Sequence, residues 1–316
     1  MKAIAIQAYG GPEQLRLMEL PTPVPADNEV LIAIAYTSVN PVDWKVCRGD
    51  LKDRIPNQFP IIPGWDAAGT IKAVGKNVAA WKGGERVFAY CRKPVIQWGT
   101  YCEYVAVDAS VVAPMPHNVS FAQAAAIPLV GLTAWQSLFD CALLTTDQTI
   151  LIHAAAGGVG GIGVQLARHI GATVYATASR GHHDYVRALG AHHVIDYTTE
   201  DFVAAIKRAV PEGVDHVFDT VGGDVYRKSF GALKRGGHIV SIREKPDETL
   251  NAKYGVRSGY VFVNPDGAEL TALADLLEEG DIQPPAIEEM PLADAARAFE
   301  RSMTGHTAGK LVLRVR

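Results

Sequence analysis

The sequence is poor in cysteine, in net charge and in long apolar runs, and each shortage argues against a class of protein. Its four cysteines, Cys47, Cys91, Cys102 and Cys141, form no Cys-x-x-Cys pair, so neither a zinc ribbon nor a redox dithiol is available. The net charge of −4 gives no electrostatic case for nucleic acid or membrane surfaces. No stretch approaches the roughly 18 consecutive apolar residues of a membrane helix, and the first ten residues alternate like a strand rather than a signal peptide. We therefore expect a cytoplasmic protein with ordinary thiols.

The sequence contains two regions that differ in composition and in the pattern of apolar residues. Residues 1–120 are rich in proline and glycine and hold short alternating strands, which are typical of a compact β-barrel. From residue 121 the rhythm changes to apolar strand, glycine turn and helix, beginning with the strand at 149–154, and this predicts a doubly wound parallel sheet. We assign the final strand at 309–316 to the barrel. We therefore expect an α/β protein of two domains, one at 1–120 and 286–316 and the other at 121–285.

A glycine-rich turn directly after the strand at 149–154 is the strongest local motif. Its core reads Ala154-x-x-Gly157-x-x-Gly160, and it opens a helix. Small residues let the backbone approach a pyrophosphate, whose charge is met by the N–H groups at the helix start. A turn that only permits tight helix–strand packing is the alternative. We expect a dinucleotide cofactor to contact Ala156, Gly157, Gly158, Val159 and Gly160.

The residues after the second strand of this predicted sheet lack the acid that is typical of NAD-binding proteins. That acid lies about 20 residues beyond the turn and accepts a hydrogen bond from the ribose 2′-OH. Here Ser179 and Arg180 follow the strand, and the first acid is Asp184. Ser179 can hydrogen-bond a 2′-phosphate, Arg180 can clamp it, and Tyr197, after the third strand, can close over it. Arg180 as a solvated loop cation is the alternative. The predicted cofactor is NADP(H).

Several segments, in the same order along the chain, resemble the medium-chain dehydrogenase/reductase superfamily. They are the segments at 64–75, 82–87, 131–135 and 219–223, together with the glycine turn. The resemblance implies a GroES-like β-barrel catalytic domain joined to a Rossmann domain. It also implies cofactor contacts from Thr133, Val221, Ile242, Phe262 and Val263, although Phe262 and Val263 are equally plausible as core residues.

The departures from this superfamily concern its zinc ions. Aligning the motifs places Asn40, Trp65 and Leu129 where zinc-dependent alcohol dehydrogenases carry the Cys, His and Cys ligands of the catalytic zinc. Asparagine is a poor zinc ligand, and tryptophan and leucine cannot bind zinc. The cysteine-rich lobe that holds a structural zinc in those relatives is missing as well. The comparison therefore predicts a zinc-free enzyme without alcohol dehydrogenase activity.

The string Asn40-Pro41-Val42-Asp43-Trp44-Lys45 and the ending at 305–312 are similar to plant-type quinone and 2-alkenal/enone oxidoreductases. The resemblance implies hydride transfer from NADPH to a quinone or an α,β-unsaturated carbonyl, in which negative charge develops on oxygen. Asn40 and Lys45 are the predicted catalytic donors to that oxygen, and Asp43 is predicted to fix Lys45 or a water. Each has a structural alternative: Asn40 holds a turn, Asp43 caps a helix, and Lys45 is merely solvated.

Aromatic side chains are the predicted walls of the substrate pocket, namely Trp65, Tyr254 and Tyr260; Trp65 as a packing residue is the alternative. In relatives of this type the segment at 258–264 runs to a dimer edge, so we expect a homodimer through continued sheet edges. Two other functions stay open: a trans-2-enoyl thioester reductase in the same fold, and an NADPH-binding sensor or structural protein without turnover. The expected partner is a small molecule, not nucleic acid or a membrane.

Overall fold

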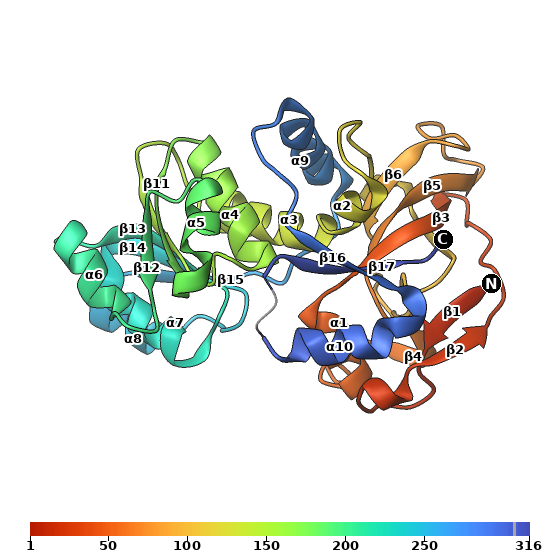
Figure 1. Ribbon diagram of the computed structural model, residues 1–316, viewed down its shortest axis with the longest axis horizontal. Coiled ribbons are helices and arrows are strands. Elements are labelled where there is room, and N and C mark those ends of the chain that lie inside the picture. Colours follow the sequence, from red (N-terminus) through yellow and green to blue (C-terminus); the bar gives the residue numbers. More distant parts are fainter. Residues whose placement is uncertain (306–307) are drawn as a thin grey trace. The chain divides into compact units, whose positions relative to one another are not determined.

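The computed structural model describes residues 1–305 and 308–316 and divides into two compact units (Figure 1). Unit 1 comprises residues 1–129, 264–279 and 284–316, and unit 2 comprises residues 130–263 and 280–283. His306 and Thr307, part of the ending compared above with plant-type oxidoreductases, lie outside the described residues. Within the described ranges, no helix combines the length and the apolar character that crossing a membrane requires.

Unit 1 is built on a seven-stranded sheet around the long strand β3 (Glu29–Val39). β3 pairs antiparallel with β5 (Asp66–Val74), β8 (Tyr104–Asp108) and β17 (Lys310–Arg314). The sheet is completed by β6 (Arg86–Tyr90), β9 (Val112–Pro114) and β16 (Ile287–Pro291), and two small sheets pair β1 (Lys2–Ala5) with β2 (Arg16–Glu19) and β4 (Asn57–Ile62) with β7 (Ile96–Trp98). Because Leu311 lies opposite Val39, the last strand of the chain starts beside the end of β3.

Helix α1 (Pro41–Arg48) follows β3 directly because the sequence supplies both of its ends. Pro41 has a fixed φ that suits the first helical position, and the Asp43 carboxylate accepts a hydrogen bond from the backbone N–H of Asn40 at 2.7 Å. Gly49, at φ 89°, takes the left-handed conformation that ends the helix. The helix-capping alternative for Asp43 is therefore present. Unit 1 also holds α2 (Phe121–Ala125) and α10 (Ala295–Met303), while α3 (Pro128–Trp135) crosses the division between the units.

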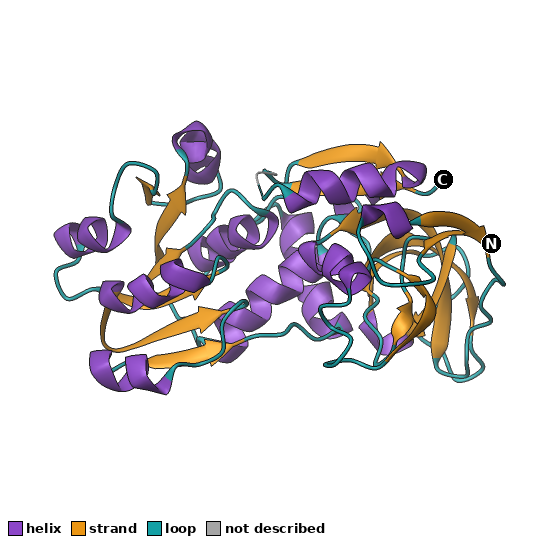
Figure 2. Cartoon of the chain, turned by 90° about the horizontal axis from the view of Figure 1, so that it is seen from below, coloured by secondary structure: helices purple, strands orange, loops and turns teal. Residues whose placement is uncertain are grey.

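Unit 2 is a parallel sheet of six strands with helices between them, as the sequence predicts (Figure 2). The strand order is β12 (His193–Asp196), β11 (Thr173–Ala178), β10 (Thr149–Ile152), β13 (Val214–Asp219), β14 (Leu233–Ser241) and β15 (Arg257–Tyr260). The connecting helices are α4 (Gly158–His169), α5 (His183–Ala188), α6 (Phe202–Ala209), α7 (Gly223–Ser229) and α8 (Glu248–Tyr254). The strand order reverses between β10 and β13, which is where sheets of this kind bind ligands.

The core of unit 2 explains why its strands read as continuous apolar runs. Ile150, Leu151 and Ile152 of β10 are all fully buried, because a parallel sheet with helical crossovers is covered on both faces. Ile206 of α6 and Phe230 after α7 pack into the same apolar cluster. The sheet is thereby held rigid beneath the carboxyl ends of its strands.

The division between the units differs from the predicted domain boundaries in two helices, because α2 and α9 both lie in unit 1. Helix α9 (Gly267–Glu279) falls in the range 121–285 that the sequence assigns to the Rossmann domain, but it belongs to unit 1 and packs on β9. A Cβ at Gly267 would lie 2.9 Å from the carbonyl oxygen of Val112, so this contact needs glycine. The side chain of Asn118 also donates to the carbonyl oxygen of Leu277 at 2.8 Å. From sequence alone α9 reads as one more crossover helix, because it follows the last strand of the parallel sheet.

Candidate active site

The glycine turn between β10 and α4 forms a backbone cradle at the start of α4. Gly157 is the N-cap residue of α4, and no described side chain caps this helix end. The N–H groups of the first turn are therefore available to an anion, which the helix dipole also favours. A Cβ on Gly160 would lie 2.5 Å from the carbonyl oxygen of Ala154, whereas one on Gly157 would lie 3.3 Å from it. Gly160 thus serves close packing, and both interpretations of the motif apply to different glycines.

The end of β10, before this turn, is surrounded by uncharged polar side chains that hydrogen-bond one another. The imidazole of His153 is 1% exposed, with Nε2 2.9 Å from the hydroxyl of Ser229 and Nδ1 3.1 Å from the hydroxyl of Thr177. Because Ser229 already donates to the carbonyl oxygen of Val225, Nε2 of His153 carries the proton and Nδ1 accepts from Thr177. Burial lowers the pKa of His153 to about 4. His153 is therefore a neutral packing residue at neutral pH.

The residues that are candidates for binding a 2′-phosphate follow the ends of two neighbouring strands, β11 and β12. Ala178 at the end of β11 lies opposite Asp196 at the end of β12, so Ser179 and Tyr197 follow paired positions. Tyr197 is 57% exposed, and Arg180 is exposed and forms no ion pair with another described residue. The Asp196 carboxylate accepts from the backbone N–H and hydroxyl of Thr198. An anion bound at these strand ends would meet a cation and two hydroxyl donors.

Asp219 organises the strand ends on the other side of β10, a role that the sequence analysis missed. Its buried carboxylate accepts hydrogen bonds from the N–H groups of Val221 at 3.0 Å and Gly222 at 2.9 Å, and from the hydroxyl of Ser241 at 2.7 Å. The N–H of Ile242 donates to the carbonyl oxygen of Asp219 at 3.2 Å. The predicted cofactor residues Val221 and Ile242 are thereby tied together. The strand ending in Asp219 carried the signal, since a buried acid at that place must be satisfied locally.

The remaining predicted residues of unit 2 are only partly brought together. Tyr260 ends β15 opposite Ser241, so it lies at the carboxyl edge of the sheet, as do Phe262 and the buried Val263 that follow it. Thr133 is 4% exposed and lies on α3. Tyr254 lies before the start of β15, at the opposite edge, with its ring 6.0 Å from that of Phe230 in the apolar core. The predicted pocket role of Tyr254 therefore gains no support, because the parallel direction of β15 separates it from Tyr260.

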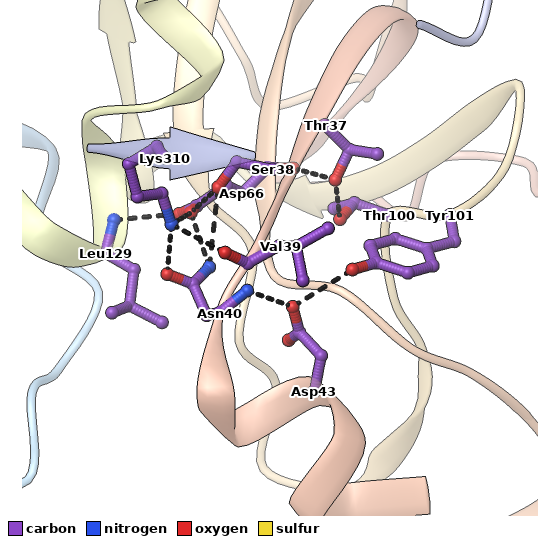
Figure 3. A network of polar contacts seen from close by, with 10 residues as sticks. All are labelled: Thr37, Ser38, Val39, Asn40, Asp43, Asp66, Thr100, Tyr101, Leu129 and Lys310. Atoms are coloured by element: carbon purple, nitrogen blue, oxygen red, sulfur yellow. Dashed lines mark hydrogen bonds and ion pairs between the residues drawn. The ribbon is translucent and has the colours of Figure 1, made fainter. Parts of the chain in front are cut away.

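In unit 1 two of the three predicted catalytic residues, Asn40 and Asp43, meet in a buried polar network whose centre is Asp66 (Figure 3). One carboxylate oxygen of Asp66 accepts from the hydroxyl of Ser38 at 2.6 Å and from the side-chain amide of Asn40 at 2.7 Å. The other accepts from the backbone N–H of Leu129 at 2.7 Å. Asp66 thus joins three segments that are far apart in the sequence.

Lys310 supplies the cation of this network. It is 5% exposed, and its ammonium group donates to the carbonyl oxygen of Val39 at 3.0 Å and to the Oδ1 atom of Asn40. Its Nζ atom lies 3.9 Å from the carboxylate of Asp66. Burial lowers the pKa of Lys310 and raises that of Asp66, and each charge opposes the shift of the other. We assign a negative charge to Asp66 and a positive charge to Lys310, because the carboxylate accepts hydrogen bonds from three donors besides the ammonium group.

Asp43 lies at the far end of the same network. One of its oxygens caps α1, as described above, and the hydroxyl of Tyr101 donates to the same oxygen at 3.2 Å. Burial raises the pKa of Asp43 to about 7, and the carboxylate of Asp66 adds to the shift, while Lys310 opposes it. When Asp43 is protonated, the negative charge of Asp66 and the positive charge of Lys310 cancel, so the three residues together carry no net charge.

Lys45 and Trp65 are placed differently from these residues. The ammonium of Lys45 lies 5.4 Å from the centre of the Trp44 ring, on a half-buried part of α1, and it helps Arg48 to lower the pKa of Asp50. Trp65 is 5% exposed and packs edge-on against Tyr90, with ring centres 6.1 Å apart. Packing, the alternative named for Trp65, suits its surroundings.

The sequence analysis missed the roles of Asp66 and Lys310, although both residues lie in segments that carry the resemblance. An alignment on zinc ligands selects the neighbouring Trp65 instead. The available signal was a lone acid and a lone lysine inside apolar strands, since such charges are buried only with a partner. Which acid pairs with which base depends on the pairing of β3, β5 and β17, which the sequence does not reveal.

A catalytic zinc ion does not fit the positions aligned with its ligands. The Oδ1 atom of Asn40 is used by the ammonium of Lys310, Trp65 packs on Tyr90, and Leu129 offers only its backbone. A further cation beside Lys310 would be repelled. Among residues 1–305 and 308–316, no three His, Cys, Asp or Glu side chains are grouped as metal ligands.

Comparisons with known proteins place this geometry among oxidoreductases. Residues 26–117 match the family model of the alcohol dehydrogenase GroES-like domain, and residues 189–313 match that of a zinc-binding dehydrogenase, a range without positions 40, 65 and 129. The chain is 32% identical over 328 residues to a chloroplast envelope quinone oxidoreductase homolog of Arabidopsis thaliana, covering 99% of this chain and 98% of that protein. It is 33% identical to the NADPH-dependent alkenal/one oxidoreductase of the same plant, covering 99% and 79%.

A solved structure agrees with these sequences. The fold matches Escherichia coli quinone oxidoreductase complexed with NADPH at a TM-score of 0.89 and 29% identity, covering 99% of this chain and all of that one. The predicted fold class, a GroES-like domain with a Rossmann domain, is thereby confirmed.

Proposed function

This chain belongs to the quinone and enone oxidoreductases of the medium-chain dehydrogenase/reductase superfamily, and we propose that it is an NADPH-dependent reductase of a quinone or an α,β-unsaturated carbonyl compound. The observation that carries the proposal is the open backbone cradle at the start of α4, with Ser179 and Arg180 instead of an acid after the neighbouring strand. The relatives named for quinone and alkenal/one reduction support the acceptor class, and the NADPH complex supports the cofactor.

The residues divide into two tasks. In unit 2 the N–H groups at Gly158 and Val159 hold the pyrophosphate, and Gly157, whose own N–H donates to Ala154, leaves room for its approach. Ser179, Arg180 and Tyr197 hold the 2′-phosphate. The rest of the cofactor site is lined by Thr133, Ala156, Val221, Ile242, Phe262 and Val263, and Gly160 keeps the turn closely packed. NADPH supplies the hydride when bound. In unit 1 the network around Asn40 and Asp43 orients hydrogen-bond donors toward the acceptor oxygen, on which negative charge develops.

We also propose that the reaction needs no zinc. The supporting observation is the Asp66–Lys310 pair, which ties together Asn40 and Leu129, two of the three positions that a zinc ion joins in alcohol dehydrogenases. A quinone or enone is already electron-poor at the carbon that accepts hydride, so hydrogen bonds to its oxygen replace a Lewis acid.

The first test is a turnover assay on protein treated with a chelator. Oxidation of NADPH is followed with p-benzoquinone, phenanthrenequinone, an enone and crotonyl-CoA, and each reaction is repeated with NADH. Turnover of a quinone or the enone with NADPH supports the proposal. Turnover of crotonyl-CoA alone would replace it with a thioester reductase, and tight NADPH binding without any turnover would replace it with a sensor. Loss of activity on chelation that added zinc restores would overturn the zinc-free reaction.

The cofactor assignment has its own matched pair of variants. Arg180→Ala removes an exposed cation that forms no ion pair with the described residues, and we expect the Kd of NADPH to rise by about tenfold or more, with that of NADH nearly unchanged. Arg187→Ala removes a nearby exposed arginine that pairs with Asp184 at 3.0 Å and should change neither. Equal losses for both cofactors in Arg180→Ala would contradict a 2′-phosphate site.

We further propose a homodimer formed through the edge strand β15. The N–H of Val261 donates to Ser241, so by alternation the N–H of Ser258 points away from β14. Ser258→Pro removes that outward donor and keeps the N–H groups that point to β14, so we expect it to weaken the dimer in sedimentation experiments. Ser258→Ala keeps the outward N–H and should leave the dimer intact. A monomeric wild-type chain would contradict the proposal.

A reducing compartment suits the four cysteines, all of which are free thiols. Burial raises the pKa values of Cys47 and Cys91 above their ordinary range, which makes both thiols inert. We propose the cytoplasm as the location, while curated relatives named as chloroplastic occupy another compartment.

A further inference from the structure

The ammonium group of Lys310 is buried in unit 1, and removing a charge from water costs free energy. It lies beside two carboxyl groups, and it is the cation that contacts Asn40. Replacing a buried ion pair by apolar residues is often neutral or stabilising, so such a pair is weak evidence for stability alone. A function for the charge is the stronger explanation.

The two charges fix the orientation of the Asn40 carboxamide. Its Oδ1 atom accepts from Lys310, and its Nδ2 atom donates to Asp66 at 2.7 Å. Rotating the amide by half a turn would set oxygen against carboxylate and N–H against ammonium, so only one orientation is allowed. Among the described residues, the second N–H of this amide meets just the hydroxyl of Ser38, which lies 3.5 Å from Nδ2 and itself donates to Asp66.

We propose that Lys310 is a positioning residue of the reductase site, acting through Asn40. Its ammonium polarises the carboxamide, which lies between Lys310 and Asp66 (Figure 3). The orientation held in this way leaves one N–H for the oxygen of the quinone or enone acceptor. The inference rests on the proposed reductase function and deepens it. Lys310, rather than Lys45, is then the cation that strengthens hydrogen bonding to the developing oxyanion.

The first experiment is a double-mutant cycle between Lys310 and Asn40. Lys310→Met is expected to lower kcat by about tenfold or more, with the KM of NADPH changed less than about twofold, because the lost effect arises at the reacting oxygen. Asn40→Ala should lower kcat by a similar factor. If Lys310 acts through Asn40, the double variant is no slower than Asn40→Ala alone. Independent multiplication of the two losses would overturn the proposal.

A variant that lacks both charges distinguishes an effect on kcat from an effect on folding. Lys310→Met alone leaves Asp66 unpaired and can fail to fold, so Asp66→Asn combined with Lys310→Met removes both charges. We expect this double variant to fold with near wild-type resistance to urea but to keep the low kcat. Recovery of both stability and rate would show that the pair only supports the structure, and would overturn the proposal.

The control is a lysine–aspartate pair of matched chemistry in unit 2, formed by Lys234 and Asp215. Lys234→Met removes a half-exposed ammonium and should leave kcat unchanged. If the wild-type chain reduces neither quinone nor enone, the proposed function fails and this inference falls with it. If the wild type is active and the cycle is multiplicative, the inference fails alone.

Discussion

The two units surround their sites with different buried polar groups, although each holds a buried carboxyl group, Asp66 in unit 1 and Asp219 in unit 2. In unit 1 the buried groups are charged: Asp66 and Lys310 form an ion pair, and Asp43 is held near its titration point. In unit 2 the buried groups around the glycine turn include a neutral relay, in which His153 is hydrogen-bonded by two hydroxyl groups. A cradle for a phosphate can be built from backbone N–H groups on a neutral base, whereas stabilising a developing oxyanion calls for fixed charge and oriented donors. The difference follows from the two tasks.

The largest effect is expected where unit 2 depends on the absence of a side chain. Gly160→Val would place a Cβ 2.5 Å from the carbonyl oxygen of Ala154 and 2.9 Å from the Cα of Ala155, neither of which can move without breaking the turn. We expect a loss of about 3 kcal/mol or more in unfolding free energy, measured by urea denaturation. Gly161→Ala is the control, because its nearest contact is the flexible end of Leu189 at 3.2 Å. Equal losses in both variants would show that backbone approach does not define the turn.

The charged network of unit 1 should make stability depend on pH in a specific window. The pKa of Asp43 is raised from 3.8 to about 7, so between these values the unfolded chain has lost a proton that the folded chain keeps. Stability contributed by Asp43 is complete below the lower value and is lost as pH rises, by about 1.4 kcal/mol per pH unit. Asp43→Asn removes this slope.

Tryptophan fluorescence is a suitable measurement for Asp43→Asn, because Trp44, Trp65, Trp81 and Trp98 lie in unit 1 and only Trp135 lies in unit 2. Urea denaturation at several pH values would then report mainly on unit 1. Parallel curves for variant and wild type across the window would mean that Asp43 is ionised in the folded protein.

The neutral relay of unit 2 predicts the opposite slope. The pKa of His153 is lowered from 6.5 to about 4 by burial, so the unfolded chain binds the extra proton between these values. Stability contributed by His153 is complete above the higher value and is lost as pH falls, again by about 1.4 kcal/mol per pH unit but over a narrower window. His153→Gln should flatten the acid side of the curve, followed by circular dichroism. An unchanged acid slope would mean that His153 is protonated in the fold.

Sequence patterns reveal the site of unit 2 better than that of unit 1. A backbone cradle needs a local string, so Ala154, Gly157 and Gly160 identify it from the sequence alone. The network of unit 1 is assembled by strand pairing across more than half of the chain. Asn40 and Asp43 could be named from their string, but their partners Asp66 and Lys310 could not, because register is a tertiary property.

The same reasoning explains where the structure departs from the expectations. Tyr254 and Tyr260 are close in sequence, which favours a shared pocket, yet a parallel strand lies between them and separates them to opposite edges of the sheet. Helix α9 follows the last strand of unit 2, which favours a place in that unit, while its small N-terminal residue Gly267 lets it pack on β9. In both cases local order along the chain is a poor guide to neighbours in space.

The smallest expected effect concerns strain in the glycine turn itself. Ala154 has φ 49°, a left-handed conformation that disfavours any residue with a Cβ. Ala154→Gly should therefore stabilise unit 2, by less than about 1 kcal/mol because glycine loses more backbone entropy on folding. Leu143→Gly, at φ 56° and with Leu143 62% exposed, is the control and should give a similar gain. If the strained residue preorganises the cradle, only Ala154→Gly should weaken NADPH binding, a few-fold, in a titration. Unchanged affinity in both variants would mean that the cradle needs no such support, and that the rigidity of unit 2 resides in its sheet alone.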